Sequence, residues 1–263
     1  MVKRNTPSRV PWVIRAIVVM SVVIATADLA TAVPVVQYTY QGETGGLIIG
    51  LHTSVPGYQN GYYFAVGQFD MTTSSAGWTS PLLTYCTDVG SLLTSPHNYS
   101  PYTIPPAQLG VHPTWVSGGI QKAAALFYLY NNSSTTADQK AGLQMAIWEA
   151  LYNTKASYAG ADFFSNANNA FYIQNPYNGN LADVNAAASY AASVLDNVLG
   201  LSPSQLTADD AHVLWLAPVE GNTITGSQGL LYPAKVPDAC SSLALLGIAV
   251  TTLGIARRKL RAA

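Results

Sequence analysis

Two residues far apart in the sequence, Cys86 and Gln144, belong to types that can react with each other. Gln144 lies at helical spacing from Ile147, Trp148 and Leu151, so its amide points with this apolar face towards the core. A buried amide without partners costs about 1–3 kcal/mol. A Cys thiol can attack the carbonyl carbon of a Gln side chain and expel ammonia. The product, an internal thioester, would remove both the thiol and the buried NH2, and would be open to attack by amines or hydroxyls.

The same pair also has a purely structural interpretation. Cys86 would then be a small buried hydrophobic residue. The Gln144 amide would be satisfied by hydrogen bonds to the backbone of a loop. The residues alone leave both interpretations open.

Other reactive residue types show no spacing typical of a site. The histidines are scattered along the chain, at His52, His97, His112 and His212. Their spacing is not that of metal ligands, and neither a nucleophile elbow nor a phosphate-binding loop is found. Asp209 to His212 is interpreted as a polar turn, and Glu149 as a charge on the solvent side of its helix. We therefore expect no metal, no cofactor and no enzymatic activity.

The composition narrows the class of protein. Only 10% of the 263 residues are charged, and the net charge is -1. This charge content is low for a soluble domain, which excludes a charged coiled coil or an acidic disordered tail. No basic patch is present to neutralise phosphates, so we expect no nucleic-acid partner. With two cysteines, a disulfide-stapled scaffold is excluded.

Residues 1–32 are typical of a secretory signal peptide. Basic residues precede an apolar stretch at 16–24, and Ala30 and Ala32 form a small-x-small cleavage site. Signal peptidase is thus expected to cut before Val33, which places the mature chain outside the cytoplasm.

Residues 236–263 combine three features in order. Val236, Pro237 and Asp238 come first, an uncharged apolar stretch at 239–256 follows, and a basic cluster that includes Arg257 and Arg258 ends the chain. A helix over the apolar stretch would be about 27 Å long, close to the thickness of a hydrocarbon core. This order resembles the PEP-CTERM sorting signals of Gram-negative bacteria, in the variant that begins with Val-Pro-Asp. The resemblance implies a transient inner-membrane anchor and processing by an exosortase.

The segment between the two ends, 33–235, is more acidic than the whole chain. It keeps 4 Lys and no Arg, against 11 Asp and Glu, which gives 4 − 11 = −7. Cys86 is its single cysteine. In an oxidising compartment, an unpaired cysteine calls for an explanation.

The patterning of this segment predicts one α+β domain, with N-terminal strands in a sandwich or barrel-like sheet and a central helical part. Strands are expected at 35–40, 46–52, 61–71, 82–86, 213–216 and 230–232. The proline-rich segment 95–113 is expected to be a loop. Helical periodicity predicts helices at 117–130, 135–152 and 182–199, the second beginning with a capping box between Thr135 and Asp138.

The two reactive segments of the core resemble the thioester domains of bacterial surface adhesins. Tyr85-Cys86-Thr87-Asp88 matches the cysteine segment of these domains, and Gln144-Met145-Ala146-Ile147-Trp148 matches their Gln-x-Ala-Ile/Val-Trp segment. Leu143 stands where that segment usually has Thr. The resemblance implies that Cys86 is the thiol donor and Gln144 the acyl donor, with a surface amine or a polysaccharide hydroxyl as the attachment target.

Three functions follow as hypotheses. The first is an exported adhesive protein of the outer surface or extracellular matrix that attaches covalently through Cys86 and Gln144. The second is a non-covalent structural protein of the matrix that binds exopolysaccharide. The third, with the least support from the residues, is a secreted hydrolase.

Overall fold

The structure is a computed structural model that describes residues 35–53, 63–75, 81–89, 96–103, 115–165, 171–176, 180–220, 223–224 and 228–234. The predicted signal peptide and sorting segment, with Ala30, Ala32, the Val236–Asp238 tripeptide, Arg257 and Arg258, lie outside the described residues. None of the helices that the structure describes combines the length and the apolar character that a membrane crossing requires.

The strands and helices alternate in blocks along the chain. The strands are β1 (Val36–Thr53), β2 (Tyr63–Thr72), β3 (Leu82–Cys86), β4 (His97–Thr103), β5 (Phe171–Pro176), β6 (Val213–Glu220), β7 (Thr223–Ile224) and β8 (Leu230–Pro233). The helices are α2 (Gly119–Tyr130), α3 (Ala137–Tyr152), the 3-10 helix η1 (Gly160–Phe164), α4 (Leu181–Leu199) and α5 (Pro203–Asp210). The predicted α+β class is confirmed.

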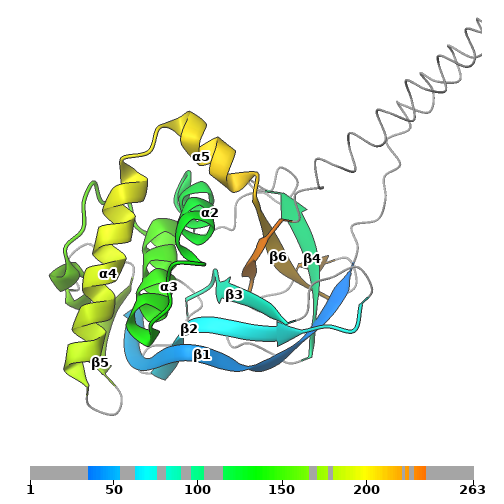
Figure 1. The fold of residues 1–263 in the computed structure, drawn as a ribbon, viewed down its shortest axis with the longest axis horizontal. Helices are drawn as coiled ribbons and strands as arrows, with labels where there is room; N and C mark the ends of the chain where they lie inside the picture. Colours follow the sequence, from blue (N-terminus) through cyan, green and yellow to red (C-terminus); the bar gives the residue numbers. More distant parts are fainter. Residues whose placement is uncertain are drawn as a thin grey trace, which may run out of the picture. The chain divides into compact units, whose positions relative to one another are not determined.

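Six strands pair in a closed, barrel-like ring. β2, β3, β8, β6, β4 and β1 are neighbours in that order, and β1 also pairs with β2. The pairings in this ring are all antiparallel. β5 extends the far end of β1, and β7 pairs with β6. The helices α2, α3 and α4 lie on one side of this ring (Figure 1).

β1 is a single strand of 18 residues, where two strands at 35–40 and 46–52 were predicted. Its register with β2 shifts between Tyr40 and Gly42, and again between Thr44 and Leu47. Gly42 has a φ of 146°, which other residues rarely adopt. The glycines therefore bend the strand at bulges rather than ending it, and this bend lets β1 pair with β4, β2 and β5.

β4 lies within the segment 95–113, which was predicted to be a loop, so that prediction is wrong for 97–103. Of the five prolines in that segment, only Pro101 falls inside the strand, opposite Leu216 of β6. A single proline is tolerated in a strand when its missing N–H is not needed for pairing.

The capping box of α3 is one residue later than predicted. The Thr136 hydroxyl accepts from the Gln139 backbone N–H at 3.2 Å, and the Gln139 side chain accepts from the Thr136 N–H at 3.2 Å. The box needs its acidic or amide residue three positions after the cap, and the longer Gln side chain reaches back from there. Thr135 and Asp138 therefore do not form the box.

Two glycines set how closely α3 approaches its neighbours. A Cβ added to Gly142 would lie 2.5 Å from the Ala187 carbonyl oxygen of α4. One added to Gly119 of α2 would lie 2.7 Å from the Ala150 carbonyl oxygen of α3. α3 is thus enclosed between α2, α4 and the sheet, and residues 141–152 are buried on all sides.

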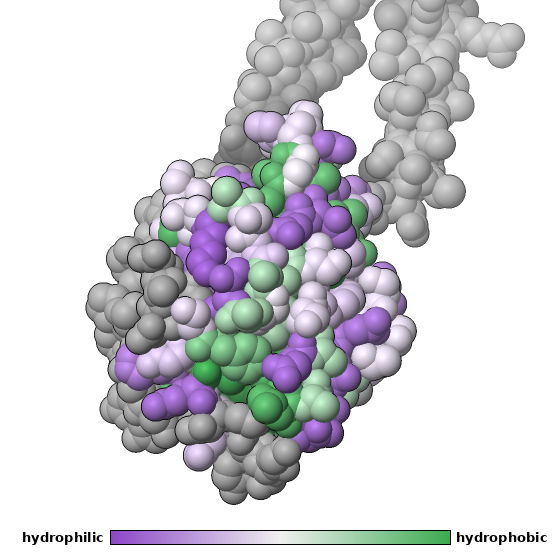
Figure 2. All heavy atoms as spheres, turned by 90° about the vertical axis from the view of Figure 1, so that its left-hand side faces the viewer, coloured by the Kyte–Doolittle hydropathy of each residue, from purple (hydrophilic) through white to green (hydrophobic). Residues whose placement is uncertain are grey.

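The exposed large apolar residues of the described chain come from several elements. On the side seen in Figure 2, hydrophilic and apolar residues are interspersed, with apolar surface gathered in the lower part. The large apolar residues that are exposed in the described chain are Val35, Ile48, Tyr63, Leu83, Tyr128, Leu129 and Leu181. Val35 directly precedes β1, and the others lie on β1, β2, β3, α2 and α4; single exposed apolar residues of this kind are normal for a protein surface.

Candidate functional site

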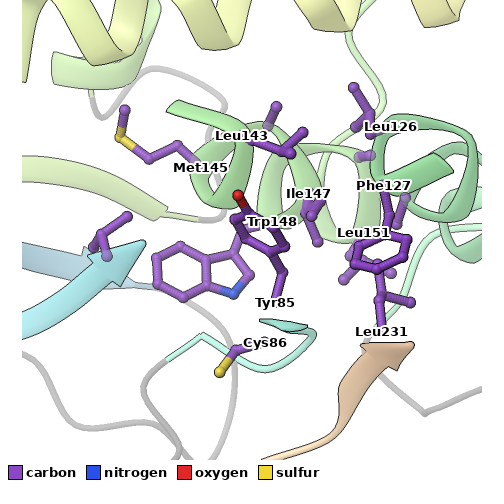
Figure 3. Close-up of a cluster of buried hydrophobic side chains, with 14 of the residues drawn as sticks. Tyr85, Cys86, Leu126, Phe127, Leu143, Met145, Ile147, Trp148, Leu151 and Leu231 are labelled. Atoms are coloured by element: carbon purple, nitrogen blue, oxygen red, sulfur yellow. The ribbon is translucent and has the colours of Figure 1, made fainter. Parts of the chain in front are cut away.

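Cys86 ends β3, and the pleat of that strand decides where its thiol lies. Tyr85 faces the helices, because its ring packs edge-on against Phe127 of α2 at 6.1 Å between centroids. Successive side chains alternate across a strand, so Cys86 points to the other face, the interior of the ring. Figure 3 agrees, since the Cys86 sulfur points away from α3 while Tyr85 and Trp148 lie towards it. Cys86 is free and fully buried.

Gln144 reaches the same residue from α3. Its side-chain oxygen accepts a hydrogen bond from the Cys86 backbone N–H at 2.8 Å. Its NH2 donates to the Cys86 carbonyl oxygen at 2.7 Å. We call these two bonds the amide clamp. Gln144 is fully buried, and the clamp uses both its acceptor and one of its donors.

The clamp replaces a missing strand partner. The pairing of β2 with β3 runs from Met71–Leu82 to Phe69–Thr84, and Cys86 lies beyond it. On the opposite edge, the Thr87 N–H donates to the Gly229 carbonyl at 2.9 Å. Because N–H and C=O groups alternate in direction along a strand, those of Cys86 face the edge that β2 has left. The Gln144 amide therefore completes the sheet at this position.

The structure thus brings together two residues that are 58 positions apart, through the backbone of one and the side chain of the other. The prediction that the Gln144 amide faces the core is confirmed by its burial. In chemical terms, the Cys86 N–H is a donor aimed at the side-chain carbonyl oxygen of Gln144. A donor in this position would polarise that carbonyl and stabilise negative charge on its oxygen.

The Cys86 thiol is protonated at rest. Its pKa is raised well above the usual value, first by burial and then by the nearby Asp88 carboxylate. Only the thiolate is a strong nucleophile, so this thiol can attack a carbonyl only if another group takes its proton. At rest, the site therefore holds the side-chain carbonyl group of Gln144 and a protonated Cys86 thiol, and no thiolate.

The strand end that carries Cys86 is fixed by three residues that sequence reasoning missed. The Trp215 indole donates to the Thr87 hydroxyl at 3.3 Å, and the Tyr152 hydroxyl donates to the Thr87 carbonyl at 3.2 Å. A Cβ on Gly229 would lie 2.5 Å from the Trp215 nitrogen, so only glycine fits between them. No local sequence signal marks these residues, since they come together only in the folded chain.

The residues that follow Gln144 in the matched segment lie in the core. Ala146, Ile147 and Trp148 are buried, and Trp148 packs edge-on against Phe171 of β5 at 5.9 Å. This packing fixes the orientation of α3, and hence of Gln144.

The interpretation of Glu149 as a surface charge is wrong. Only 1% of Glu149 is exposed, and its carboxylate accepts from the Asn153 side chain at 2.5 Å. Burial raises its pKa to about 7, against lowering by Asn153 and Lys155. The interpretation assumed that α3 has one buried face, whereas helices and sheet enclose it.

The histidines that the structure describes are packed against aromatic rings. His52, His97 and His212 each lie against a tyrosine ring, at centroid distances of 4.9, 5.4 and 4.6 Å. His112 lies outside the described part of the chain. No group of three possible metal ligands occurs where the structure is described. The segment interpreted as a polar turn, Asp209 to His212, begins as the last turn of α5 and becomes a turn only after Asp210.

No family model and no curated protein matches this chain. Among solved structures, it is similar to the thioester domain of the Staphylococcus aureus TIE protein, with a TM-score of 0.34 and 8% sequence identity. The match covers 78% of this chain and 81% of the other. At that TM-score the likeness carries no argument about the site, which rests on the contacts given above.

Proposed function

We propose that this chain is an exported adhesive protein of the cell surface or extracellular matrix, which attaches covalently through a thioester between Cys86 and Gln144. The observation that supports the bond is the amide clamp, with its hydrogen bonds of 2.8 and 2.7 Å. The support for export is the sequence of the two ends, with signal peptidase and an exosortase as processing partners. The attachment targets are surface amines or polysaccharide hydroxyls.

The reaction needs no cofactor. The Cys86 side chain must first turn from the interior of the ring towards Gln144. Its sulfur then attacks the side-chain carbonyl carbon of Gln144, and the S–C bond forms as the C–N bond breaks. The thiol proton leaves with the amide NH2 as ammonia, so atoms and charge balance. The Cys86 N–H would stabilise the charge that develops on the carbonyl oxygen. A target amine or hydroxyl would later attack the thioester and return the thiol.

Burial would make such a thioester long-lived. Both residues are fully buried, so water has little access to the acyl carbon. The same burial means that a target must uncover the bond before it reacts. The adhesive step is therefore expected to depend on a local opening of the segments around β3.

Intact mass tests the bond. Purified without ammonium or other amines, the wild-type protein should be lighter than its sequence mass by about 17 Da, the mass of ammonia. Cys86→Ala and Gln144→Ala should each abolish this loss. Gln68→Ala is the matched control, because Gln68 is also buried, at 3% exposure, but bonds to Asn131 instead. A wild-type protein at its full sequence mass would overturn the proposal.

A second candidate is a non-covalent structural or polysaccharide-binding matrix protein. The specific observation that favours it is the clamp itself, which satisfies the Gln144 amide without any reaction, while the Cys86 sulfur points to the opposite face. Under this alternative, binding to extracellular polysaccharide should survive Cys86→Ala unchanged. Binding that is lost in this variant alone would favour the covalent function.

A further inference from the structure

The amide clamp uses one particular hydrogen of the Gln144 NH2 group. The side-chain oxygen of Gln144 accepts from the Cys86 N–H at 2.8 Å, and its nitrogen donates to the Cys86 carbonyl oxygen at 2.7 Å. Because an amide is planar, two bonds from it to one residue require the N–H that lies on the same side of the C–N bond as the amide oxygen. The second N–H lies on the other side and takes no part in the clamp.

An attached target would replace this same hydrogen. In the proposed attachment step, a target amine attacks the thioester carbon, the N–C bond forms and the C–S bond breaks. One amine proton passes to the sulfur and restores the Cys86 thiol. The product is a secondary amide, which prefers the trans form with its N–H opposite the amide oxygen. The first carbon of the target therefore stands on the oxygen side, where the clamp needs a hydrogen.

The clamp has no room for a carbon in this position. A carbon bonded to the Gln144 nitrogen would lie about 1.46 Å from it. Along a straight bond of 2.7 Å, that carbon would be only about 1.2 Å from the Cys86 carbonyl oxygen, far inside van der Waals contact. A cis amide would keep the clamp but is disfavoured by about 60-fold or more. An ester to a target hydroxyl has no N–H to donate, so neither class of target restores the clamp.

The surrounding structure cannot make room by moving α3. Gln144 and Cys86 are both fully buried. One turn before the end of the match, α3 packs on α4 through Gly142, where even an added Cβ would lie 2.5 Å from the Ala187 carbonyl oxygen. α3 is therefore held against β3 from behind. The substituted Gln144 side chain must itself leave the strand edge.

We propose that attachment of a target ejects the Gln144 side chain from the amide clamp, so that Cys86 cannot reverse the linkage; this inference rests on the proposed thioester. Reversal requires the thiol to attack the Gln144 carbonyl carbon while the Cys86 N–H stabilises negative charge on its oxygen. After ejection, the carbonyl has lost that donor, and its carbon is no longer held beside residue 86. Ammonia, by contrast, restores a primary amide and with it the clamp. Only the unattached protein can therefore return to the thioester.

The test compares two products of the same wild-type protein. Thioester-containing protein, lighter by about 17 Da, is treated either with ammonium chloride, which returns Gln144, or with methylamine, which leaves the protein about 14 Da above its sequence mass. Hydrogen exchange of the backbone amides is then followed by NMR on isotope-labelled protein. Gln144→Met, which has neither the clamp nor the thioester, is the reference for an open strand edge.

In the methylamine product, the Cys86 N–H should exchange about tenfold faster or more than in the ammonium-treated protein, close to its rate in Gln144→Met. The Thr87 N–H is the internal control, because it donates to the Gly229 carbonyl at 2.9 Å on the opposite edge of β3.

The second readout is the return to the thioester after the amines are removed. The ammonium-treated protein should lose ammonia again, and the methylamine product should lose methylamine at least about 60-fold more slowly, because only its cis form fits the clamp. The product with 2-methoxyethylamine, an amine about as basic as ammonia, should behave like the methylamine product. This control excludes the basicity of the leaving amine as the cause.

The outcomes separate the two proposals. A wild type that neither loses ammonia nor takes up methylamine overturns the thioester and the ejection together. If the methylamine product forms but keeps the Cys86 exchange rate of the ammonium-treated protein, or returns to the thioester equally fast, the ejection is overturned and the thioester stands. An equal rise in exchange at Cys86 and Thr87 also overturns the ejection, because the product then opens as a whole rather than at one strand edge.

Discussion

The contribution of the amide clamp to the stability of the fold can be measured separately from any thioester chemistry. In a Cys86→Ala background the thioester cannot form, but the backbone N–H and C=O of residue 86 remain. Adding Gln144→Met then replaces the amide by an apolar side chain of similar length. Both backbone groups are left buried without a partner, since Gln144 is their partner at 2.8 and 2.7 Å. At about 1–3 kcal/mol for each group, the free energy of unfolding should fall by about 2–6 kcal/mol.

Urea unfolding, monitored by tryptophan fluorescence, measures this difference between the single and the double variant. The matched control is Gln121→Met in the same background. The Gln121 side-chain oxygen is buried with no hydrogen-bond partner among the described residues, so its removal should be neutral or slightly stabilising. If the free energies of unfolding of Cys86→Ala/Gln144→Met and Cys86→Ala differ by less than about 0.5 kcal/mol, the clamp does not stabilise the strand edge and the reasoning fails.

Two further predictions concern the helix that carries Gln144. Gly142→Ala should destabilise the fold by about 1–3 kcal/mol, because its Cβ would lie 2.5 Å from the Ala187 carbonyl oxygen. The control is Gly200→Ala, whose Cβ would meet nothing nearer than 3.5 Å. Equal urea midpoints for these two variants would contradict the close approach of α3 and α4. Burial raises the pKa of Glu149 to about 7 in the folded chain, from 4.5. The folded state therefore holds this proton more tightly, so stability is highest below pH 4.5 and falls by about 3 kcal/mol as the pH rises to 7. Glu149→Gln should flatten that part of the pH–stability curve, and an unchanged curve would show that another group causes it.

Periodicity was enough to predict the elements that carry the site. The residues at i+3, i+4 and i+7 from Gln144 placed the amide on the core face, because that stripe fills one side of a helix. The same logic failed for Glu149, since a stripe cannot reveal that a second and a third neighbour cover the remaining faces. α5 was not predicted, although two signals mark its start. Ser202 and Gln205 form a capping box, and Pro203 is the first residue of the helix. Its short length and weak apolar pattern hid these signals.

Contacts between distant segments were beyond the reach of local patterns. β4 was not predicted because its segment is rich in proline. Only the pairing with β1 and β6 shows that this strand tolerates Pro101. The direction of the Cys86 side chain depends on the register of β3 with β8, which the sequence does not specify. The sequence was enough to identify Cys86 and Gln144 as a candidate pair. The hydrogen bonds of the amide clamp, however, can be identified only in the folded chain.

The clamp and the proposed thioester compete for the same atoms. Forming the thioester removes the Gln144 nitrogen, and with it the hydrogen bond to the Cys86 carbonyl. That carbonyl then loses a buried partner, at a cost of about 1–3 kcal/mol. Returning ammonia would restore the bond, so mass action by ammonium favours the amide form of the protein. If the thioester forms, the clamp and the thioester are two states of one site, and the ammonium concentration sets which of them is isolated. A full sequence mass is therefore decisive only when ammonium has been excluded throughout purification.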